Sequence, residues 1–380
     1  MTFESLGLSP VLAKTLAEQK YTQPYPIQEK AIPAILSKKD VLGIAQTGSG
    51  KTAAYVLPLL MNLQGTKVSK NRHINVLVLV PTRELTMQVS EVFYKLGKDL
   101  PERIKTKAVY GGVSINPQMM GMNGVQVLIA TPGRLLELTE SNAVHLSDID
   151  TLVLDEADKM LNLGFREEMD RIIAQLPKKR QNLLFSATLN EDITSINQIL
   201  LHDPMVIRIE PEEDYFDLIS QLGYFVSEER KGPLLRYIIK KQNLQQVLVF
   251  TSSTFKADTV ADKLRKNGIN ATAIHSKKSQ KARTDALEKF KSGNLRVLVA
   301  TDLISRGIDI QFLPHVINYE LPRSPKDYIH RIGRTGRAES PGEAISLITP
   351  EEQHHFRIIQ KKMGQPITMI DSEGLNLNGF

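Results

Sequence analysis

The stretch Ala45–Thr52, which reads Ala-Gln-Thr-Gly-Ser-Gly-Lys-Thr, restricts the possible folds more than any other part of the chain. It follows the apolar run 41–44 and precedes the apolar segment 53–57, a pattern that predicts a strand, a glycine-rich turn and a helix. The spacing is that of a phosphate-binding loop, with alanine in the place of the first glycine. Gly48 and Gly50 lack a Cβ atom, so backbone N–H groups can curl closely around phosphate oxygens.

Two side chains and a helix end complete this predicted anion site. Lys51 can reach the terminal phosphates of a nucleotide, and the Thr52 hydroxyl can hold Mg²⁺. The helix that follows directs its positive N-terminal end at the anion. Taken alone, the same letters could describe a Gly/Ser turn that carries a surface lysine, so the interpretation depends on the rest of the chain.

Composition limits the class of protein. The chain has 380 residues, too many for one hydrophobic core, which predicts two domains. Lys and Arg number 48 against 42 Asp and Glu, a net charge of +6 that suits a polyanionic partner without requiring one. Cysteine is absent, which excludes disulfides and thiolate metal sites and favours a reducing compartment. No apolar run approaches roughly 18 residues and no signal peptide opens the chain, so we expect a cytoplasmic protein without a membrane span.

Two series of apolar, strand-like runs alternate with polar, helix-like segments along the chain. Because the runs are continuously apolar, they favour parallel sheets that are covered by helices on both faces. The acidic segment 209–214 separates the two series. We therefore expect an α/β protein with two lobes, residues 1–208 and 218–380, joined by a short linker at 209–217. The runs comprise 41–44, 76–80, 105–110, 125–129, 151–154 and 181–185, then 247–250, 271–274, 297–300, 316–319 and 344–347.

The segment 152–158, Leu-Val-Leu-Asp-Glu-Ala-Asp, predicts a buried strand that ends in acids. Acids at the carboxyl end of a parallel strand lie at the ligand edge of the sheet. Asp155 is placed to hold Mg²⁺ through water, and Glu156 to orient and deprotonate an attacking water. The alternative is an acidic first turn of the next helix, which favours carboxylates in any case.

The residues at 155–158 spell, in one-letter code, the name of the DEAD-box ATP-dependent RNA helicases of superfamily 2, and the chain resembles this family over about residues 3–350. The resemblance implies two RecA-like lobes: an ATP-binding lobe and a helicase C-terminal lobe. Ten of the family's motifs match in order: 45–52 (motif I), 81–85 (Ia), 111–112 (double glycine), 131–134 (Ib), 155–158 (II), 186–188 (III), 249–251 (IV), 280–283 (the QxxR element), 300–302 with 306–309 (V) and 330–337 (VI).

The resemblance also implies a site for ATP and Mg²⁺ that uses both lobes. Gln28 would read the adenine edge, since an amide offers both a donor and an acceptor, and Phe3 would stack on the ring. Tyr25 stands where the family usually has threonine, which puts the fine geometry in question. Asp309 resembles the ribose contact. The residues expected to bind ATP are Phe3, Gln28, Ala45, Gln46, Thr47, Gly48, Ser49, Gly50, Lys51, Thr52, Gly307 and Asp309.

For hydrolysis, the resemblance makes Arg334 and Arg337 arginine fingers that neutralise charge on the γ-phosphate in the transition state. The alternative for this segment is a basic, solvated helix end. The catalytic set is then Lys51, Asp155, Glu156, Arg334 and Arg337, with Thr52 and Asp155 on the metal. The residues expected to couple the ATP site to RNA are Asp158, Ser186, Thr188 and His330.

The RNA-binding residues implied by the resemblance carry hydroxyls, backbone amides or guanidinium groups, which suit phosphate oxygens and read no base. Only 6% of the chain is aromatic and tryptophan is absent, which argues against a base-stacking platform. Ser276 stands where the family usually has glycine. The expected RNA contacts are Arg83, Gly111, Gly112, Thr131, Arg134, Thr251, Gln280, Arg283 and Thr301.

The sequence thus predicts a monomeric ATP-dependent RNA helicase that unwinds short duplexes locally as its lobes close and reopen. Within the family it resembles bacterial enzymes of the RhlE-like branch. Two alternatives stay open. One is an RNA clamp in which turnover is incidental, and RNA-stimulated phosphate release would decide against it. The other is a DNA translocase, which a comparison of RNA with DNA as stimulator would exclude.

Overall fold

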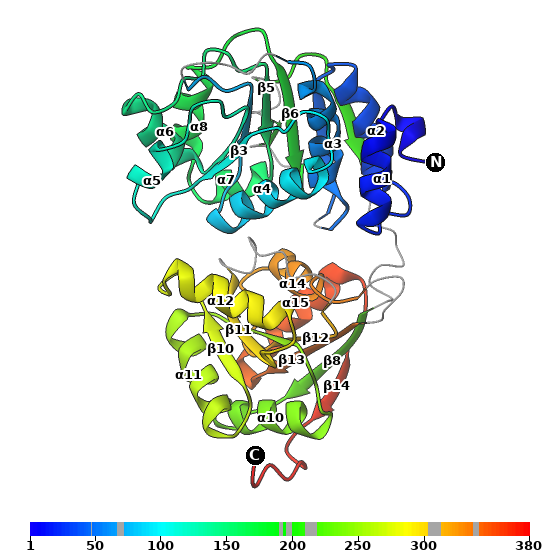
Figure 1. The fold of residues 1–380 in the computed structure, drawn as a ribbon. Helices are drawn as coiled ribbons and strands as arrows, with labels where there is room; N and C mark the ends of the chain where they lie inside the picture. The colour runs from blue at the N-terminus through cyan, green and yellow to red at the C-terminus, as the bar shows by residue number, and fades with distance from the viewer. Residues whose placement is uncertain are drawn as a thin grey trace. The chain divides into compact units, whose positions relative to one another are not determined.

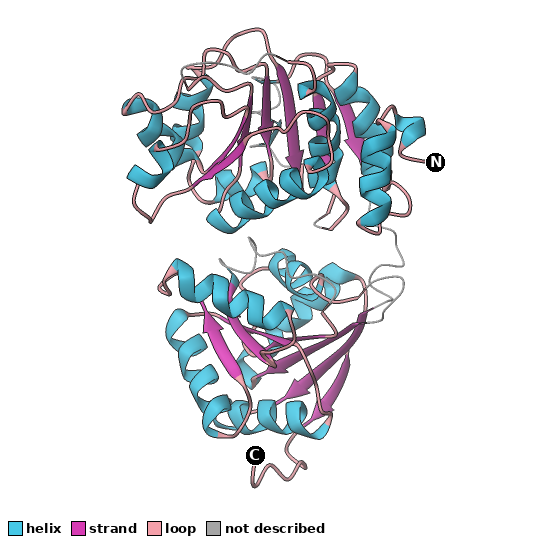
Figure 2. Cartoon of the chain, viewed as in Figure 1, coloured by secondary structure: helices cyan, strands magenta, loops and turns pink. Residues whose placement is uncertain are grey.

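The computed structural model describes residues 1–46, 48–66, 72–189, 193–194, 200–209, 219–302, 313–336 and 342–380. The chain divides into two compact units, Met1–Pro211 and Glu212–Phe380 (Figure 1). Each consists of a sheet with helices on both faces (Figure 2). Four of the expected site residues, Thr47, Gly307, Asp309 and Arg337, lie outside the described residues, as does nearly all of the expected linker.

The first unit contains a seven-stranded parallel sheet with the order β3-β4-β2-β5-β6-β1-β7. Along its strands successive residues face opposite layers, so Val76 and Val78 join one core cluster while Leu77 and Leu79 join the other. The strands are β1 (Val41–Ile44), β2 (Val76–Leu79), β3 (Thr106–Val109), β4 (Val127–Ala130), β5 (Thr151–Leu154), β6 (Gln181–Ser186) and β7 (Met205–Arg208).

The helices of the first unit fill these two layers. One core cluster contains α1 (Pro10–Glu18), α2 (Pro26–Leu36), α3 (Lys51–Leu63) and α4 (Arg83–Gly97). The other contains α6 (Pro132–Glu140), α7 (Ala157–Asn162) and α8 (Arg166–Ile173), and the short elements η1 (Glu4–Leu6) and α5 (Asn116–Met119) complete the unit. Several helices begin at a proline, where the missing N–H has no cost.

The second unit repeats this topology. Its sheet order is β10-β11-β9-β12-β13-β8-β14, which is the order of the first sheet with seven added to every label. The strands are β8 (Ile219–Phe225), β9 (Val247–Thr251), β10 (Ala271–Ile274), β11 (Val297–Thr301), β12 (His315–Asn318), β13 (Gly342–Ile348) and β14 (Thr368–Asp371). The helices are α10 (Glu228–Lys241), α11 (Thr254–Lys266), α12 (Gln280–Lys291), α14 (Pro325–Ile332), η3 (Pro350–Glu352) and α15 (Gln353–Met363).

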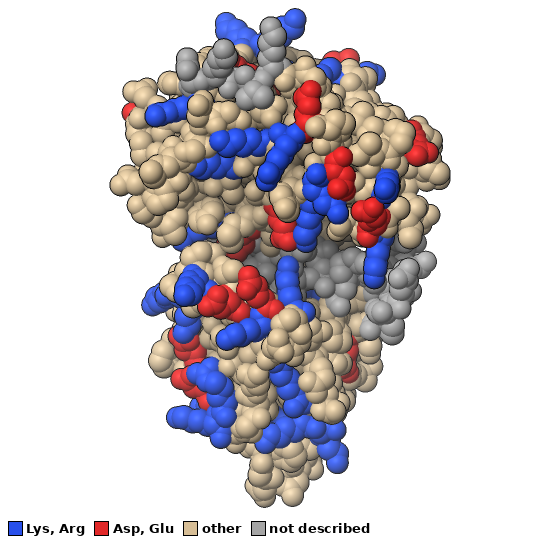
Figure 3. Space-filling model, viewed as in Figure 1, with Lys and Arg blue, Asp and Glu red and all other residues tan. Residues whose placement is uncertain are grey.

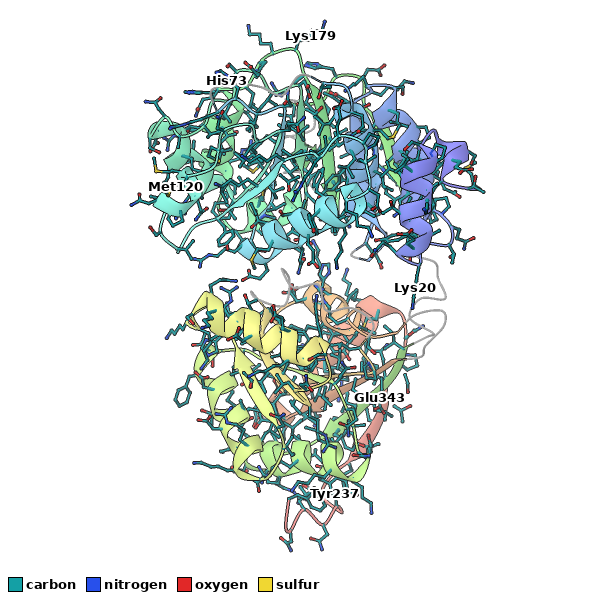
Figure 4. The ribbon with its side chains drawn as sticks, in the orientation of Figure 1. Lys20, His73, Met120, Lys179, Tyr237 and Glu343 are labelled. Carbon is teal, nitrogen blue, oxygen red and sulfur yellow. The ribbon has the colours of Figure 1, made fainter. Side chains whose placement is uncertain are left out.

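The C-terminal segment returns to the second unit. The Phe380 ring makes an edge contact with Tyr237 of α10 at a centroid distance of 5.1 Å, and Arg236 donates to the Phe380 carbonyl at 2.6 Å. Figure 4 labels Tyr237 beside this segment. The last residues of the chain are therefore packed on α10.

The predicted α/β class with two parallel sheets is confirmed, and each predicted strand has a counterpart among β1–β6 and β9–β13. Three strands, β7, β8 and β14, were not predicted. Two of them, β7 and β14, are edge strands with exposed residues, which lack the continuous apolar run of a central strand. Among the helices that the structure describes, no helix is long and apolar enough to span a membrane.

Candidate nucleotide and RNA site

The predicted phosphate loop joins β1 to α3. Gly48 and Gly50 have φ angles of +90° and +84°, a left-handed conformation that glycine adopts without strain. Lys51 is the first residue of α3, and its Nζ donates to the carbonyls of Ala45 and Gln46, the latter at 2.7 Å. Burial lowers the pKa of Lys51, and the nearby carboxylates Asp155 and Glu156 oppose this. The ammonium is thus held inside the loop by carbonyl oxygens that a phosphate can replace.

Gln28 links the loop to α2. Its side chain is fully buried, with Oε1 accepting from the Tyr25 N–H at 3.0 Å and Nε2 donating to the Gly50 carbonyl at 3.1 Å. Each amide atom keeps one further hydrogen-bonding position, so these bonds are compatible with contact to adenine. The adenine role of Gln28 stays a prediction, and its link to the phosphate loop was not predicted.

Two aromatic residues expected near the base differ in their surroundings. Phe3 is buried in the first core cluster of the unit, whereas Tyr25 is 41% exposed. Tyr25 lies against the loop, because a Cβ atom at Gly50 would be 2.9 Å from its Cδ2 and 2.4 Å from Nε2 of Gln28. Gly50 is therefore required for space as well as for its backbone angle. The stacking of Phe3 on adenine stays a prediction.

The acidic motif follows β5 as predicted. Asp155 is buried, and its Oδ2 accepts from the Tyr55 hydroxyl at 2.8 Å. Burial, together with repulsion from Glu156, raises the pKa of Asp155 to about 6, and Lys51 acts in the opposite direction. Glu156 caps α7 at φ +54°, a left-handed conformation that is uncommon for a residue other than glycine. Its Oε1 pairs with Lys159 at 2.6 Å.

Three of the residues expected to couple the sites lie together. The Thr188 hydroxyl donates to Oδ2 of Asp158 at 3.1 Å. The Ser186 hydroxyl donates to the Thr188 carbonyl at 2.8 Å and accepts from its N–H at 3.2 Å. These bonds tie the start of α7, after β5, to the end of the neighbouring strand β6.

Two groups of expected site residues lie at the carboxyl edge of the first sheet. The ends of β1, β5 and β6, which are neighbours in the sheet, carry the phosphate loop, the acidic motif and Ser186. The ends of β2, β3 and β4, also neighbours, carry Arg83, the double glycine 111–112 and Thr131. Because the carboxyl edge of an open α/β sheet is where ligands bind, the expected ATP and RNA residues occupy adjacent halves of one such edge.

The second group is internally connected. The Arg83 guanidinium lies directly against Gly112, where a Cβ atom would collide with it, and Gly112 has a φ of +75°. Arg134 donates from Nη2 to the Val113 carbonyl at 2.8 Å and from Nε to Glu137 at 2.9 Å. Its Nη1 is buried and has no hydrogen-bond partner among the residues described. This donor is therefore buried and unsatisfied in the described part of the chain.

The second unit presents its expected RNA residues at the same topological positions. Thr251 ends β9, Thr301 ends β11, and Gln280 and Arg283 lie in the first turn of α12, after β10. These three strands are neighbours in the order β10-β11-β9, which corresponds to β3-β4-β2 of the first unit. Both sheets thus place the motifs on equivalent halves of their carboxyl edges.

Arg331 of motif VI is held by hydrogen bonds inside the second unit. Its side chain is 2% exposed and forms two bonds with Asp302, at 2.6 and 2.8 Å. It also donates to Asn318 Oδ1 at 3.0 Å and to the Glu320 carbonyl at 2.6 Å, and it lies over the Phe250 ring. Arg331 therefore joins α14 to the ends of β11 and β12.

The remaining arginines of motif VI were predicted to act on ATP. Arg334 follows α14 and is buried, and Arg337 lies outside the described residues. His330 lies in the last turn of α14. The finger role of the two arginines stays a prediction.

The turn that carries the unusual Ser276 is anchored by charged groups. His275 is buried, with Nε2 3.0 Å from Asp258, and Lys278 pairs with the same carboxylate at 2.8 Å.

On the surface, Lys and Arg are interspersed with Asp and Glu over the face shown in Figure 3, without gathering into one basic patch. Charge alone therefore does not mark an RNA surface on this face.

Comparison with known proteins agrees with the geometry. Residues 25–196 match the DEAD/DEAH box helicase family, and residues 230–339 match the helicase conserved C-terminal domain. The DEAD-box ATP-dependent RNA helicase RhpA of Helicobacter pylori strain 26695 is 41% identical over 379 residues, which cover 99% of this chain and 75% of RhpA. The ATP-dependent RNA helicase CshA of Limosilactobacillus reuteri is 40% identical over 362 residues, covering 95% of this chain and 72% of CshA.

Two solved structures show the same fold over the whole chain. Dbp5 of Saccharomyces cerevisiae, bound to RNA and ADP BeF3, has a TM-score of 0.85 at 29% identity and covers 98% of this chain and 96% of its own. A DEAD box protein from Methanococcus jannaschii has a TM-score of 0.55 at 34% identity, with coverage of 97% and 99%. The chain therefore belongs to the DEAD-box RNA helicase family.

Proposed function

We propose that this protein is an ATP-dependent RNA helicase that binds the backbone of single-stranded RNA and locally unwinds short RNA duplexes. ATP hydrolysis is coupled to closure and opening of its two lobes. One observation carries the proposal. One half of the carboxyl edge of the first sheet carries the phosphate loop and two acids, and the other half carries hydroxyl, glycine and arginine groups. Next to the acids, Thr188 is hydrogen-bonded to Asp158.

The donor set fits Mg²⁺. Asp155 and Glu156 are adjacent buried or half-buried carboxylates, and Oε2 of Glu156 is buried without a hydrogen-bond partner in the described part of the chain. Hard oxygen ligands of this kind suit Mg²⁺, with Thr52 and Asp155 as the residues that would hold it. When bound, Mg²⁺ neutralises charge on the β- and γ-phosphates.

The chain's own groups account for the remaining steps. Lys51 exchanges its loop carbonyls for phosphate oxygens, which offer it a full negative charge instead of a dipole. Glu156 orients the attacking water and accepts its proton. Arg334 and Arg337 neutralise the charge that develops on the γ-phosphate. Because these arginines belong to the second lobe, turnover requires both lobes.

The names of the relatives support this assignment. RhpA and CshA are named ATP-dependent RNA helicases, and Dbp5 has been solved with RNA and ADP BeF3. We place the lobe that binds ATP at residues 1–208, the linker at 209–217 and the helicase C-terminal lobe at 218–380. A monomeric state, a cytoplasmic location and membership of the RhlE-like branch are further parts of the proposal.

The test measures phosphate release and strand separation by the full chain on a short RNA duplex and on a DNA duplex of the same sequence. We expect RNA to stimulate ATP hydrolysis, RNA strands to separate only with ATP, and DNA to do neither. Lys51→Ala should abolish both activities, because the phosphate charge loses its compensation. Stimulation by DNA equal to that by RNA, or hydrolysis that RNA does not stimulate, would refute the proposal.

A further inference from the structure

Tyr55 follows the phosphate loop along α3 and contacts Asp155, one of the two residues that would hold Mg²⁺. It lies one turn after Lys51 and is fully buried, with its ring 5.4 Å from that of Phe185. Its hydroxyl donates to Oδ2 of Asp155 at 2.8 Å. The sequence motifs do not include Tyr55.

The direction of this hydrogen bond follows from the number of protons. A phenol has one proton and a carboxylate accepts, so the Tyr55 proton points at Asp155. The bond holds one carboxylate oxygen in place and leaves the other, Oδ1, without a contact to Tyr55.

We propose that Tyr55 is a positioning residue for the Mg²⁺ site, where its phenol fixes the orientation of the Asp155 carboxylate. The proposal rests on the proposed function, since it concerns the cation that accompanies ATP. Groups that orient metal ligands in this way are worth about 10- to 100-fold in metal affinity or activity.

The hydroxyl is the only polar group of the side chain, so Tyr55→Phe removes this donor while it keeps the ring that packs on Phe185. Oδ2 of Asp155 then loses the hydrogen bond that holds it.

The test compares nucleotide affinity in Mg²⁺ and in EDTA, with ADP as the probe and the full chain as the protein. In Tyr55→Phe we expect the gain in affinity due to Mg²⁺ to fall about 10-fold or more, while the affinity in EDTA stays at the parent value. The matched control is Tyr94→Phe on α4, where the ring is 62% exposed. This variant should keep the parent's dependence on Mg²⁺.

The bond between the phenol and Asp155 allows a second measurement. If Tyr55 acts through Asp155, the loss in Tyr55→Phe and the loss in Asp155→Asn should be less than additive when combined. Should Tyr55→Phe prove unfolded by circular dichroism, 3-fluorotyrosine at position 55 keeps the ring and the hydroxyl but changes the strength of the hydroxyl as a donor to Asp155. The Mg²⁺ gain should then differ from that of the parent.

Each outcome decides the proposal. An unchanged Mg²⁺ gain in Tyr55→Phe, or in the fluorotyrosine protein, overturns it. An equal loss of affinity with Mg²⁺ and with EDTA also overturns it, because that result indicates that the ring only supports the packing of the loop. Failure of the parent protein to bind ADP under either condition would instead refute the proposed function.

Discussion

Replacing Arg331 by alanine should destabilise the second unit without removing a contact to ATP. Arg331 is buried and makes two hydrogen bonds with Asp302, one with Asn318 and one with the Glu320 carbonyl. The variant removes the Arg331 charge from beside Asp302 and takes one hydrogen-bond donor from Asn318 and one from the Glu320 carbonyl. Motif VI therefore contains an arginine whose main effect we expect on folding.

The size of the effect follows from burial. Removing one partner of a buried ion pair costs about 3–5 kcal/mol. The Asp302 side chain is 30% exposed and can be partly solvated, so we expect the lower end, about 3 kcal/mol. For a unit of this size, 1 kcal/mol corresponds to a shift in Tm of about 2–4 °C. Arg331→Ala should thus lower the melting temperature of the second unit by about 6–12 °C.

Differential scanning calorimetry of the full chain provides the assay, and Arg323→Ala provides the control. Arg323 is exposed just before α14 and should be replaceable with almost no change. Replacing both members of the pair, as in Asp302→Leu with Arg331→Met, should recover part of the loss, because both charges of the pair are then absent. A melting temperature for Arg331→Ala within about 2 °C of the parent would refute the structural role.

Four further predictions concern the site. Glu156→Gln should bind ATP and RNA but stop hydrolysis, since the amide cannot accept the proton of the water; loss of ATP binding would show a structural role instead. Gln28→Ala should weaken ATP more than GTP if the amide reads adenine, whereas equal weakening would reduce its role to the bond with Gly50. Arg134→Ala should weaken all RNA sequences alike and reduce the salt dependence of binding by about one phosphate contact; an unchanged salt slope contradicts that contact. Residues 1–208 alone should hydrolyse ATP at background rate without RNA stimulation, and RNA-stimulated turnover by this fragment would exclude the two-lobe mechanism.

The central strands were predictable because burial on both faces requires an apolar run. Segments such as 76–79 and 297–301 meet that requirement. Asp155 and Glu156 directly follow the carboxyl end of β5, as the sequence predicted. Edge strands cannot be found in this way, because they need no continuous apolar run. Met205 and Val206 of β7 are exposed. The inner strand β8 was missed for another reason: its sequence, Ile-Ser-Gln-Leu-Gly-Tyr-Phe, has no continuous apolar run.

The pairings inside the site could not be predicted. Tyr55 has the pattern of an apolar residue on a buried helix, and nothing in that pattern indicates its bond to Asp155, a hundred positions away. The same holds for Arg331 and Asp302, which α14 and β11 bring together. Periodicity shows which face of an element is buried, but the partner across the interface depends on the packing of the whole unit.

The common strand order of the two sheets bears on the stoichiometry of nucleotide binding. The connection in the second unit that corresponds to the phosphate loop runs from β8 to α10 and consists of residues 226–227 alone, which is too short to wrap around an anion. The helix behind it begins with the acidic Glu228, and its buried cation, Lys231, is already neutralised by Glu352 at 2.9 Å. At this position of the two sheets, among the residues that the structure describes, only the first unit can cradle a phosphate, and we expect no second nucleotide site at the start of α10.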